Sequence, residues 1–124
     1  MSTLADVLVL VVAAIHVYIL ILEMFLWQTP RGMRSFGTDA AFAARSATLA
    51  ANQGLYNGFL GAGLIWGVLA GDTLGPPVKL FFLACVIVAG VYGAATVSKR
   101  ILMVQALPAA IALAVVLLDG RVAA

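Results

Sequence analysis

Four long apolar stretches alternate with short polar connections along the chain, at residues 7–27, 48–70, 78–97 and 101–118. Each is about the 20 residues that a helix needs to cross a hydrocarbon core of ~30 Å. A helix satisfies its own backbone hydrogen bonds in lipid, whereas an open strand does not. The pattern therefore predicts an all-α fold over residues 1–124, a single-domain integral membrane four-helix bundle with short loops.

The three connections differ in length and composition. The first, 28–47, contains Thr38 and Asp39 as a predicted helix cap and should hold a short interfacial helix before the second span. The second, 71–77, ends in two prolines and is predicted to be a turn. The third, 98–100, is so short that the flanking spans should form a tight antiparallel hairpin.

Composition supports the membrane class. The chain is 65% hydrophobic and 10% charged, with a mean hydropathy of +1.15, whereas about a quarter of the residues in soluble domains are charged. Its one cysteine, Cys85, excludes an intrachain disulfide. The net charge of +2 comes from basic residues scattered at the ends of apolar stretches, which favours a topology signal over nucleic-acid binding.

The basic residues also predict an orientation in the membrane. Five lie in the first and third connections and two on the opposite side: Arg31, Arg34, Arg45, Lys99 and Arg100 against Lys79 and Arg121. An excess of basic residues marks the cytoplasmic side. We therefore expect a multi-pass protein with both termini outside.

Two ionisable residues and an indole share one face of the first span. His16, Glu23 and Trp27 follow one another at i, i+7 and i+11, which places them within an arc of ~40°. Glu23 should lie ~6 Å, and His16 ~16 Å, from the cytoplasmic end. A carboxylate is costly to bury ionised in a membrane, so Glu23 and His16 are the candidates for proton handling.

Polar side chains on the other three spans fall at the same depth. By the rise of ~1.5 Å per residue they share the cytoplasmic half of the bundle with Glu23, while outer stretches such as 8–12 and 111–118 are almost purely aliphatic. This common layer predicts a cavity or network that binds a small amphipathic or lipophilic molecule. Its expected ligand-binding residues are Trp27, Asn52, Gln53, Tyr56, Asn57, Tyr92, Thr96 and Gln105.

Structural alternatives stay open for these residues. Glu23 could be an interfacial carboxylate paired with Arg31 or Arg34, and His16 a hydrogen-bonded buried side chain. The amides on the second span could serve as interhelical hydrogen-bonding groups, and Trp27 could belong to an interfacial aromatic belt. Metal binding is poorly supported because His16 and Glu23 supply two ligands where a zinc site needs three or four. No cofactor motif is present.

Glycines at four-residue spacing predict two close helix contacts from the second span. Gly54 and Gly58 form one small-xxx-small pair, and Gly63, Gly67 and Gly71 continue at the same step. One contact could lie within the subunit. The other could build a homo-oligomer.

The pattern formed by several of these residues is similar to that of the domain-of-unknown-function 1304 family of small bacterial membrane proteins. The resemblance rests on His16, the Leu-Glu-Met string at 22–24, the strings at 52–54 and 56–59, and Thr96 and Gln105 with Pro108. It implies a four-span protein of the bacterial inner membrane. It implies no particular activity.

Three function classes therefore follow from the residues. The first is a proton-coupled transporter that uses Glu23, similar in architecture to small multidrug-resistance transporters but without their motifs. The second is a membrane-embedded isomerase or epimerase with His16 and Glu23 as acid and base, by analogy with sterol-isomerase-like proteins. The third is a structural or accessory subunit in which the polar layer locks the bundle.

Overall fold

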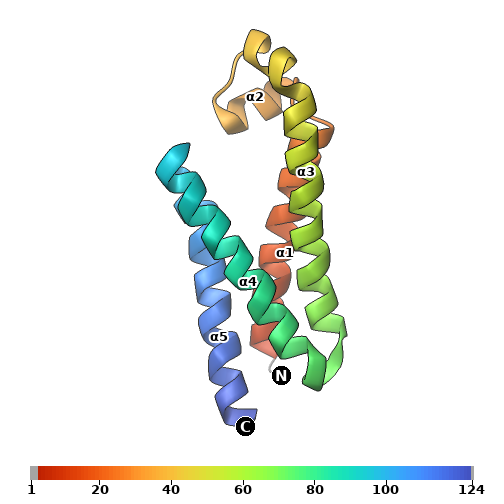
Figure 1. Ribbon diagram of the computed structural model, residues 1–124, viewed down its shortest axis with the longest axis vertical. Coiled ribbons are helices and arrows are strands. Elements are labelled where there is room, and N and C mark those ends of the chain that lie inside the picture. The colour runs from red at the N-terminus through yellow and green to blue at the C-terminus, as the bar shows by residue number, and fades with distance from the viewer. Residues whose placement is uncertain (1–2, 124) are drawn as a thin grey trace. The chain divides into compact units, whose positions relative to one another are not determined.

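The computed structural model describes residues 3–123, with side chains described as far as residue 119. Over these residues it contains helices and no strand, so the predicted all-α class is confirmed. In chain order the elements are α1 (Thr3–Met24), α2 (Pro30–Phe36), α3 (Ala40–Leu69), α4 (Gly71–Thr96), the π-helix η1 (Leu102–Ala106) and α5 (Leu107–Ala123) (Figure 1). The side chain of Arg121, counted above as an outer charge, lies outside the described residues.

Three stretches of helix are long and apolar enough to cross a membrane: Thr3–Met24, Gly71–Thr96 and Leu102–Asp119. These support a membrane protein. Helix α3 is longer, but its run of amides, glycines and a tyrosine from Asn52 to Gly58 lowers its hydropathy, and it is not among the three. The four-span bundle is therefore not confirmed.

The chain divides into two compact units that share helices α1 and α3. We call Met1–Ile15 with Leu60–Ala124 the core unit, and His16–Phe59 the polar unit. Each unit is described by itself below.

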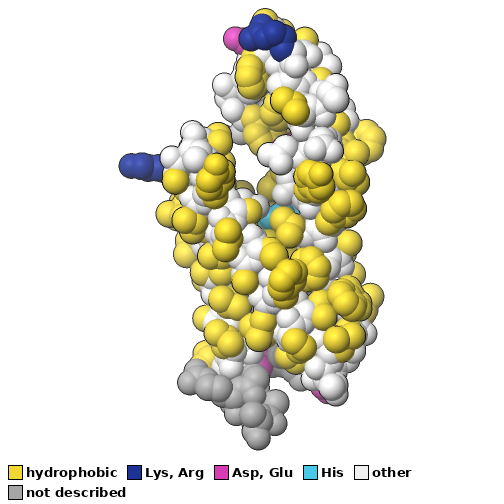
Figure 2. Space-filling view, in the orientation of Figure 1, with side chains coloured by type: hydrophobic (Ala, Val, Ile, Leu, Met, Phe, Trp, Pro, Cys, Tyr) yellow, Lys and Arg dark blue, Asp and Glu magenta, His cyan; other side chains and the backbone are white. Residues whose placement is uncertain are grey.

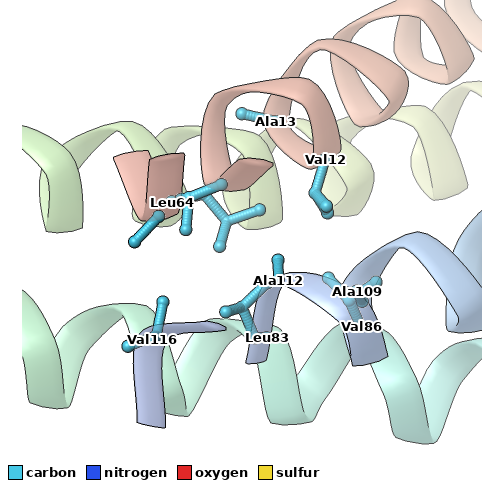
Figure 3. Packing of buried hydrophobic residues seen from close by; sticks show 10 residues of the cluster. Val12, Ala13, Leu64, Leu83, Val86, Ala109, Ala112 and Val116 are labelled. Carbon is cyan, nitrogen blue, oxygen red and sulfur yellow. The ribbon is translucent and has the colours of Figure 1, made fainter. Parts of the chain in front are cut away.

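Aliphatic side chains from four helices form the interior of the core unit. In Figure 3, Val12 of α1, Leu64 of α3, Leu83 of α4 and Ala112 of α5 point toward one another. The small residues of α5 let it approach α4 closely, and α4 and α5 run side by side (Figure 1). The buried cluster comprises Ala5, Val9, Val12, Ala13, Leu64, Leu83, Val86, Ala109, Ala112 and Val116.

The connection between α3 and α4 differs from the prediction. The expected turn at 71–77 is wrong, because α4 already begins at Gly71 and contains Pro76 and Pro77. The reversal is made at Ala70 and Gly71, where a φ of 84° suits a residue without a Cβ. Proline's fixed φ is compatible with helix, so two prolines near the start of a helix need not mark a turn.

Two contacts hold α3 and α1 to α4 in the core unit. A Cβ at Gly67 would lie 2.7 Å from Cγ of Lys79, so this glycine makes room for the lysine stem. The Lys79 side chain is 2% exposed, and its Nζ donates to Oδ1 of Asp6 at 2.5 Å. The predicted outer charge at Lys79 is therefore a buried ion pair with the start of α1.

The segment before Pro108 forms a π-helix rather than a simple kink. Leu107 N–H donates to the carbonyl of Leu102, five residues earlier. In a regular α-helix the ring of Pro108 would clash with the carbonyl of Val104. A π-helical turn is wider, so it leaves room for the ring beside that carbonyl. Helix α4 accommodates η1 at Gly90, where a Cβ would lie 2.8 Å from the backbone nitrogen of Ala106.

In the polar unit, α1 ends at Met24, three residues before the predicted end of the first span. Helix α2 follows after a short turn. Its cap is Thr29, whose Oγ1 accepts from Gly32 N–H at 3.2 Å, and it ends at Gly37 with φ 67°. Helix α3 begins after Asp39, whose Oδ1 accepts from Phe42 N–H at 2.8 Å, so the predicted cap is confirmed.

Apolar and charged side chains occupy different parts of the surface (Figure 2). Figure 2 shows hydrophobic side chains covering the helices, whereas the Lys and Arg side chains in view gather at helix ends, near the start of α3 and near the end of α4. In the core unit, α1 begins and α5 ends at the same end (Figure 1).

Candidate functional site

The candidate site is built around Glu23, in the last turn of α1. Its carboxyl group is close to fully buried, and Oε1 accepts a hydrogen bond from Nδ2 of Asn57 at 2.6 Å. The same amide donates to the backbone carbonyl of Gln53 at 3.2 Å, which fixes its orientation one turn earlier on α3. Two predicted site residues, 34 positions apart, are thus brought together.

Glycines of α3 allow this contact to form. A Cβ at Gly54 would lie 3.1 Å from Cβ of Glu23 and 3.3 Å from the carbonyl oxygen of Leu20. One at Gly58 would lie 2.7 Å from the end of the Leu20 side chain. The predicted small-xxx-small pair therefore packs against α1 within the subunit, and a helix without side chains at these positions can place Asn57 beside the carboxyl group.

His16 lies seven residues, close to two turns, before Glu23 on the same helix. At 100° per residue the two side chains point within ~20° of each other around the axis. His16 is fully buried and Glu23 is 8% exposed. Both residues are thus buried on the same helix, and their shared role stays a prediction.

The other predicted polar residues of α3 are exposed. They are Asn52, Gln53 and Tyr56, and Tyr56 packs edge-on against Phe59 at a ring distance of 5.9 Å. The hydrogen bond to Glu23 comes from the Asn57 side chain. Their role as a shared wall with Asn57 stays a prediction.

Trp27 occupies a different position from the predicted one. Because α1 ends at Met24, the indole does not continue the face of His16 and Glu23. Its Nε1 donates to Oγ of Ser46 at 3.1 Å, and its ring lies 4.9 Å from that of Phe36. Trp27 thus joins α2 to α3, and its expected part in ligand binding stays a prediction.

The remaining predicted residues belong to the core unit. Tyr92 and Thr96 are exposed on α4, and Thr96 Oγ1 donates to the carbonyl of Tyr92 at 2.7 Å. Gln105 is half-buried within η1. The meeting of these three with Glu23 in one layer stays a prediction.

The arrangement around Glu23 can exchange a proton or hold a cation. Asn57 donates to Oε1, and a carboxyl group can accept at both of its oxygens. The alternative pairing of Glu23 with Arg31 or Arg34 is not among the ion pairs of the described side chains. Over the same residues, no three His, Cys, Asp or Glu side chains gather where they could hold a metal ion.

Two side-chain contacts had not been predicted. The buried Lys79–Asp6 pair joins residues 73 positions apart, and the charge of Lys79 inside an apolar helix was its signal. Nη1 of Arg31 lies 3.4 Å from Oη of Tyr18. Tyr18, a polar residue inside the first apolar stretch, was the signal for the second contact.

Comparison with known proteins supports the resemblance. The sequence model of the family described as "protein of unknown function (DUF1304)" matches residues 10–117. The chain is 35% identical over 107 residues to the uncharacterized protein YpaA of Lactococcus lactis subsp. lactis (strain IL1403), covering 85% of this chain and 89% of the relative. No solved structure gives a significant match.

Proposed function

We propose that this chain, which belongs to the DUF1304 family, binds a small amphipathic or lipophilic molecule beside Glu23 and couples that binding to a proton. One observation carries the proposal. Glu23 is 8% exposed at the end of a helix able to span a membrane, and Nδ2 of Asn57 donates to Oε1 of its carboxyl group. A carboxyl group has two oxygens that can accept, so beside Asn57 it can also take up a proton or a positively charged ligand.

The two occupants would exclude each other. An ionised Glu23 accepts from Asn57 and attracts a cation, whereas a protonated Glu23 has lost the charge that holds it. An Asn side chain can present either its NH₂ group or its carbonyl, so Asn57 can partner both forms of the carboxyl group. Competition between a proton and a cation for one carboxyl group is the minimum requirement for coupled exchange.

A transport assay tests this function. Protein reconstituted in liposomes with an entrapped pH dye is given an ethidium gradient, and the proton flux is recorded for wild type, Glu23→Gln and Asp39→Asn. Asp39 is the matched control because it is an exposed carboxylate of the same unit that caps α3. We expect flux in wild type and Asp39→Asn and none in Glu23→Gln; equal flux in all three would refute the proposal.

The isomerase alternative is favoured by one observation, the burial of His16 and Glu23 on one helix face. Such a pair could remove and return a proton on an apolar skeleton. A lipophilic ketone incubated with the protein in deuterated buffer distinguishes the two functions. Deuterium incorporation beside the carbonyl that needs both His16 and Glu23, without any gradient, would favour catalysis over transport.

A further inference from the structure

We propose that the polar unit binds an anionic phospholipid, with Arg31 and Tyr18 holding its phosphate group. The two residues come from different elements, α2 and α1, and both side chains are exposed. Nη1 of Arg31 lies within hydrogen-bonding distance of the Tyr18 hydroxyl, at 3.4 Å. The site involves neither Glu23 nor Asn57.

Helix α2 is held firmly enough to position Arg31. Gly32 packs against the turn that links α1 to α2, since a Cβ there would lie 1.9 Å from the carbonyl oxygen of Leu26. The ring of Phe36, at the other end of α2, packs on Trp27, and Trp27 donates to Ser46 of α3. Arg31 is thus carried by a helix fixed at both of its ends.

The charges nearby favour an anion. Three arginines of this unit, Arg31, Arg34 and Arg45, are exposed, and none forms an ion pair given for the described side chains. Of the two carboxylates in the unit, Asp39 caps α3 and Glu23 is buried against Asn57. The exposed surface is therefore positively charged, as in the lipid-binding surfaces beside spanning helices.

The contact lies beside an apolar surface of α1. Tyr18 lies six residues before the end of α1, ~9 Å along the helix axis, inside a stretch able to span the membrane. Ile21, one turn further along α1, and Phe25, in the turn that follows the helix, are exposed. The acyl chain of a lipid can lie along these apolar side chains while the lipid phosphate reaches Arg31. A free phosphate ion would lack this apolar contact.

The two side chains offer complementary donors. A guanidinium binds two phosphate oxygens through parallel N–H groups. The Tyr18 hydroxyl accepts from Arg31, so its own proton can be donated to a third oxygen. A lipid such as phosphatidylglycerol keeps its full negative charge, whereas phosphatidylcholine carries a compensating ammonium group.

Lipid retention measured by native mass spectrometry of the purified protein in non-ionic detergent tests the proposal. Dioleoylphosphatidylglycerol, dioleoylphosphatidylcholine and inorganic phosphate are compared for wild type, Arg31→Gln, Arg31→Lys, Tyr18→Phe and Arg45→Gln. Arg45→Gln is the matched control, an exposed arginine of the same unit without the tyrosine contact. Thermal unfolding of each variant verifies that it is folded.

We expect wild type to retain phosphatidylglycerol over phosphatidylcholine. Arg31→Gln should weaken that retention roughly tenfold, because hydrogen bonds to charged groups contribute about 1.4 kcal/mol or more. Arg31→Lys and Tyr18→Phe should give intermediate losses, and Arg45→Gln should retain the wild-type affinity. An unchanged Arg31→Gln, an equal loss in Arg45→Gln, or displacement of the lipid by inorganic phosphate would overturn the proposal.

Discussion

At the scale of single residues, the central contact is the hydrogen bond from Asn57 to Glu23. The sequence could predict that both residues lie inside long helices, and their depth in a membrane stays a prediction. The pairing itself could not be predicted, because Asn52, Gln53 and Asn57 spread over a wide arc of α3 and helix periodicity does not say which side meets α1. The glycines supply that information in three dimensions, since Gly54 and Gly58 are the positions that face α1.

Removing the Asn57 amide should destabilise the polar unit. In Asn57→Ala the buried carboxyl group loses its donor, which should lower the free energy of unfolding by about 1–3 kcal/mol. Asn52→Ala removes an exposed amide of the same helix and should change it by less than about 0.5 kcal/mol. Unfolding in mixed detergent micelles measures both values, and equal losses would contradict the assigned hydrogen bond.

Substituting Asp6 should lower the free energy of unfolding more than substituting Lys79, because Lys79 is the more buried member of the ion pair. Asp6→Asn leaves the Lys79 ammonium group, on a side chain that is 2% exposed, without its counter-ion. The free energy of unfolding should fall by about 3–5 kcal/mol. Lys79→Met leaves Asp6, whose side chain is 32% exposed, in contact with water and should cost no more than about 2 kcal/mol.

The double variant completes the test of this pair. Asp6→Asn with Lys79→Met removes both charges and keeps the aliphatic stem, so it should regain most of the stability lost in Asp6→Asn. Additive losses in the same unfolding measurement would show that the two side chains do not depend on each other.

At the scale of elements, the differences from the prediction concern where helices begin and end. The short helix of the first connection was expected after the Asp39 cap, where α3 begins, whereas α2 follows Thr29-Pro30, a cap with a proline at the first helical position, and ends at Gly37. The turn expected at 71–77 is helical, because α4 begins at Gly71 and includes both prolines. The three long apolar helices were predicted correctly because mean hydropathy depends on many residues. The position of a helix end depends on one or two residues, so it is harder to predict.

Docking of α2 depends on Gly32. A Cβ in Gly32→Ala would meet the backbone carbonyl of Leu26, which cannot move aside as a side chain can, so α2 should be displaced from the turn that precedes it. Hydrogen exchange of residues 30–37 should then increase by roughly tenfold or more, the equivalent of about 1.4 kcal/mol. Gly58→Ala meets only the end of the Leu20 side chain and should leave this exchange at the wild-type rate. Equal exchange in the two variants would contradict the packing.

At the scale of the whole molecule, the aliphatic cluster and the Glu23–Asn57 contact belong to different units, and the buried Lys79–Asp6 pair belongs to the same unit as the cluster. The core unit holds the aliphatic cluster, drawn in part from the stretches predicted to be a dry outer half, and the polar unit holds Glu23 with Asn57. Gly54 and Gly58 of α3 pack against α1, and Gly63 and Gly67 pack against α4, whereas nothing lies within 4 Å of a Cβ placed at Gly71. The homo-oligomer expected through these glycines stays a prediction.

The predicted orientation is tested on intact cells. With Cys85 replaced by alanine, single cysteines at Ser35 and Ser98 should resist a membrane-impermeant maleimide added from outside and react after the cells are opened. The reason is the excess of basic residues in the connections that carry these serines, with Lys79 on the opposite side neutralised by Asp6. Efficient labelling of either position from outside would reverse the topology.

The most direct test of the account is the protonation of Glu23 itself. Infrared difference spectra of the purified protein, recorded on addition of tetraphenylphosphonium, report a change in the protonated carboxyl band. We predict a change in wild type and Asp39→Asn, a shifted band in Asn57→Ala, and no change in Glu23→Gln. Binding of the cation without any carboxyl signal, or the same signal in Glu23→Gln, would contradict a proton-coupled site at Glu23.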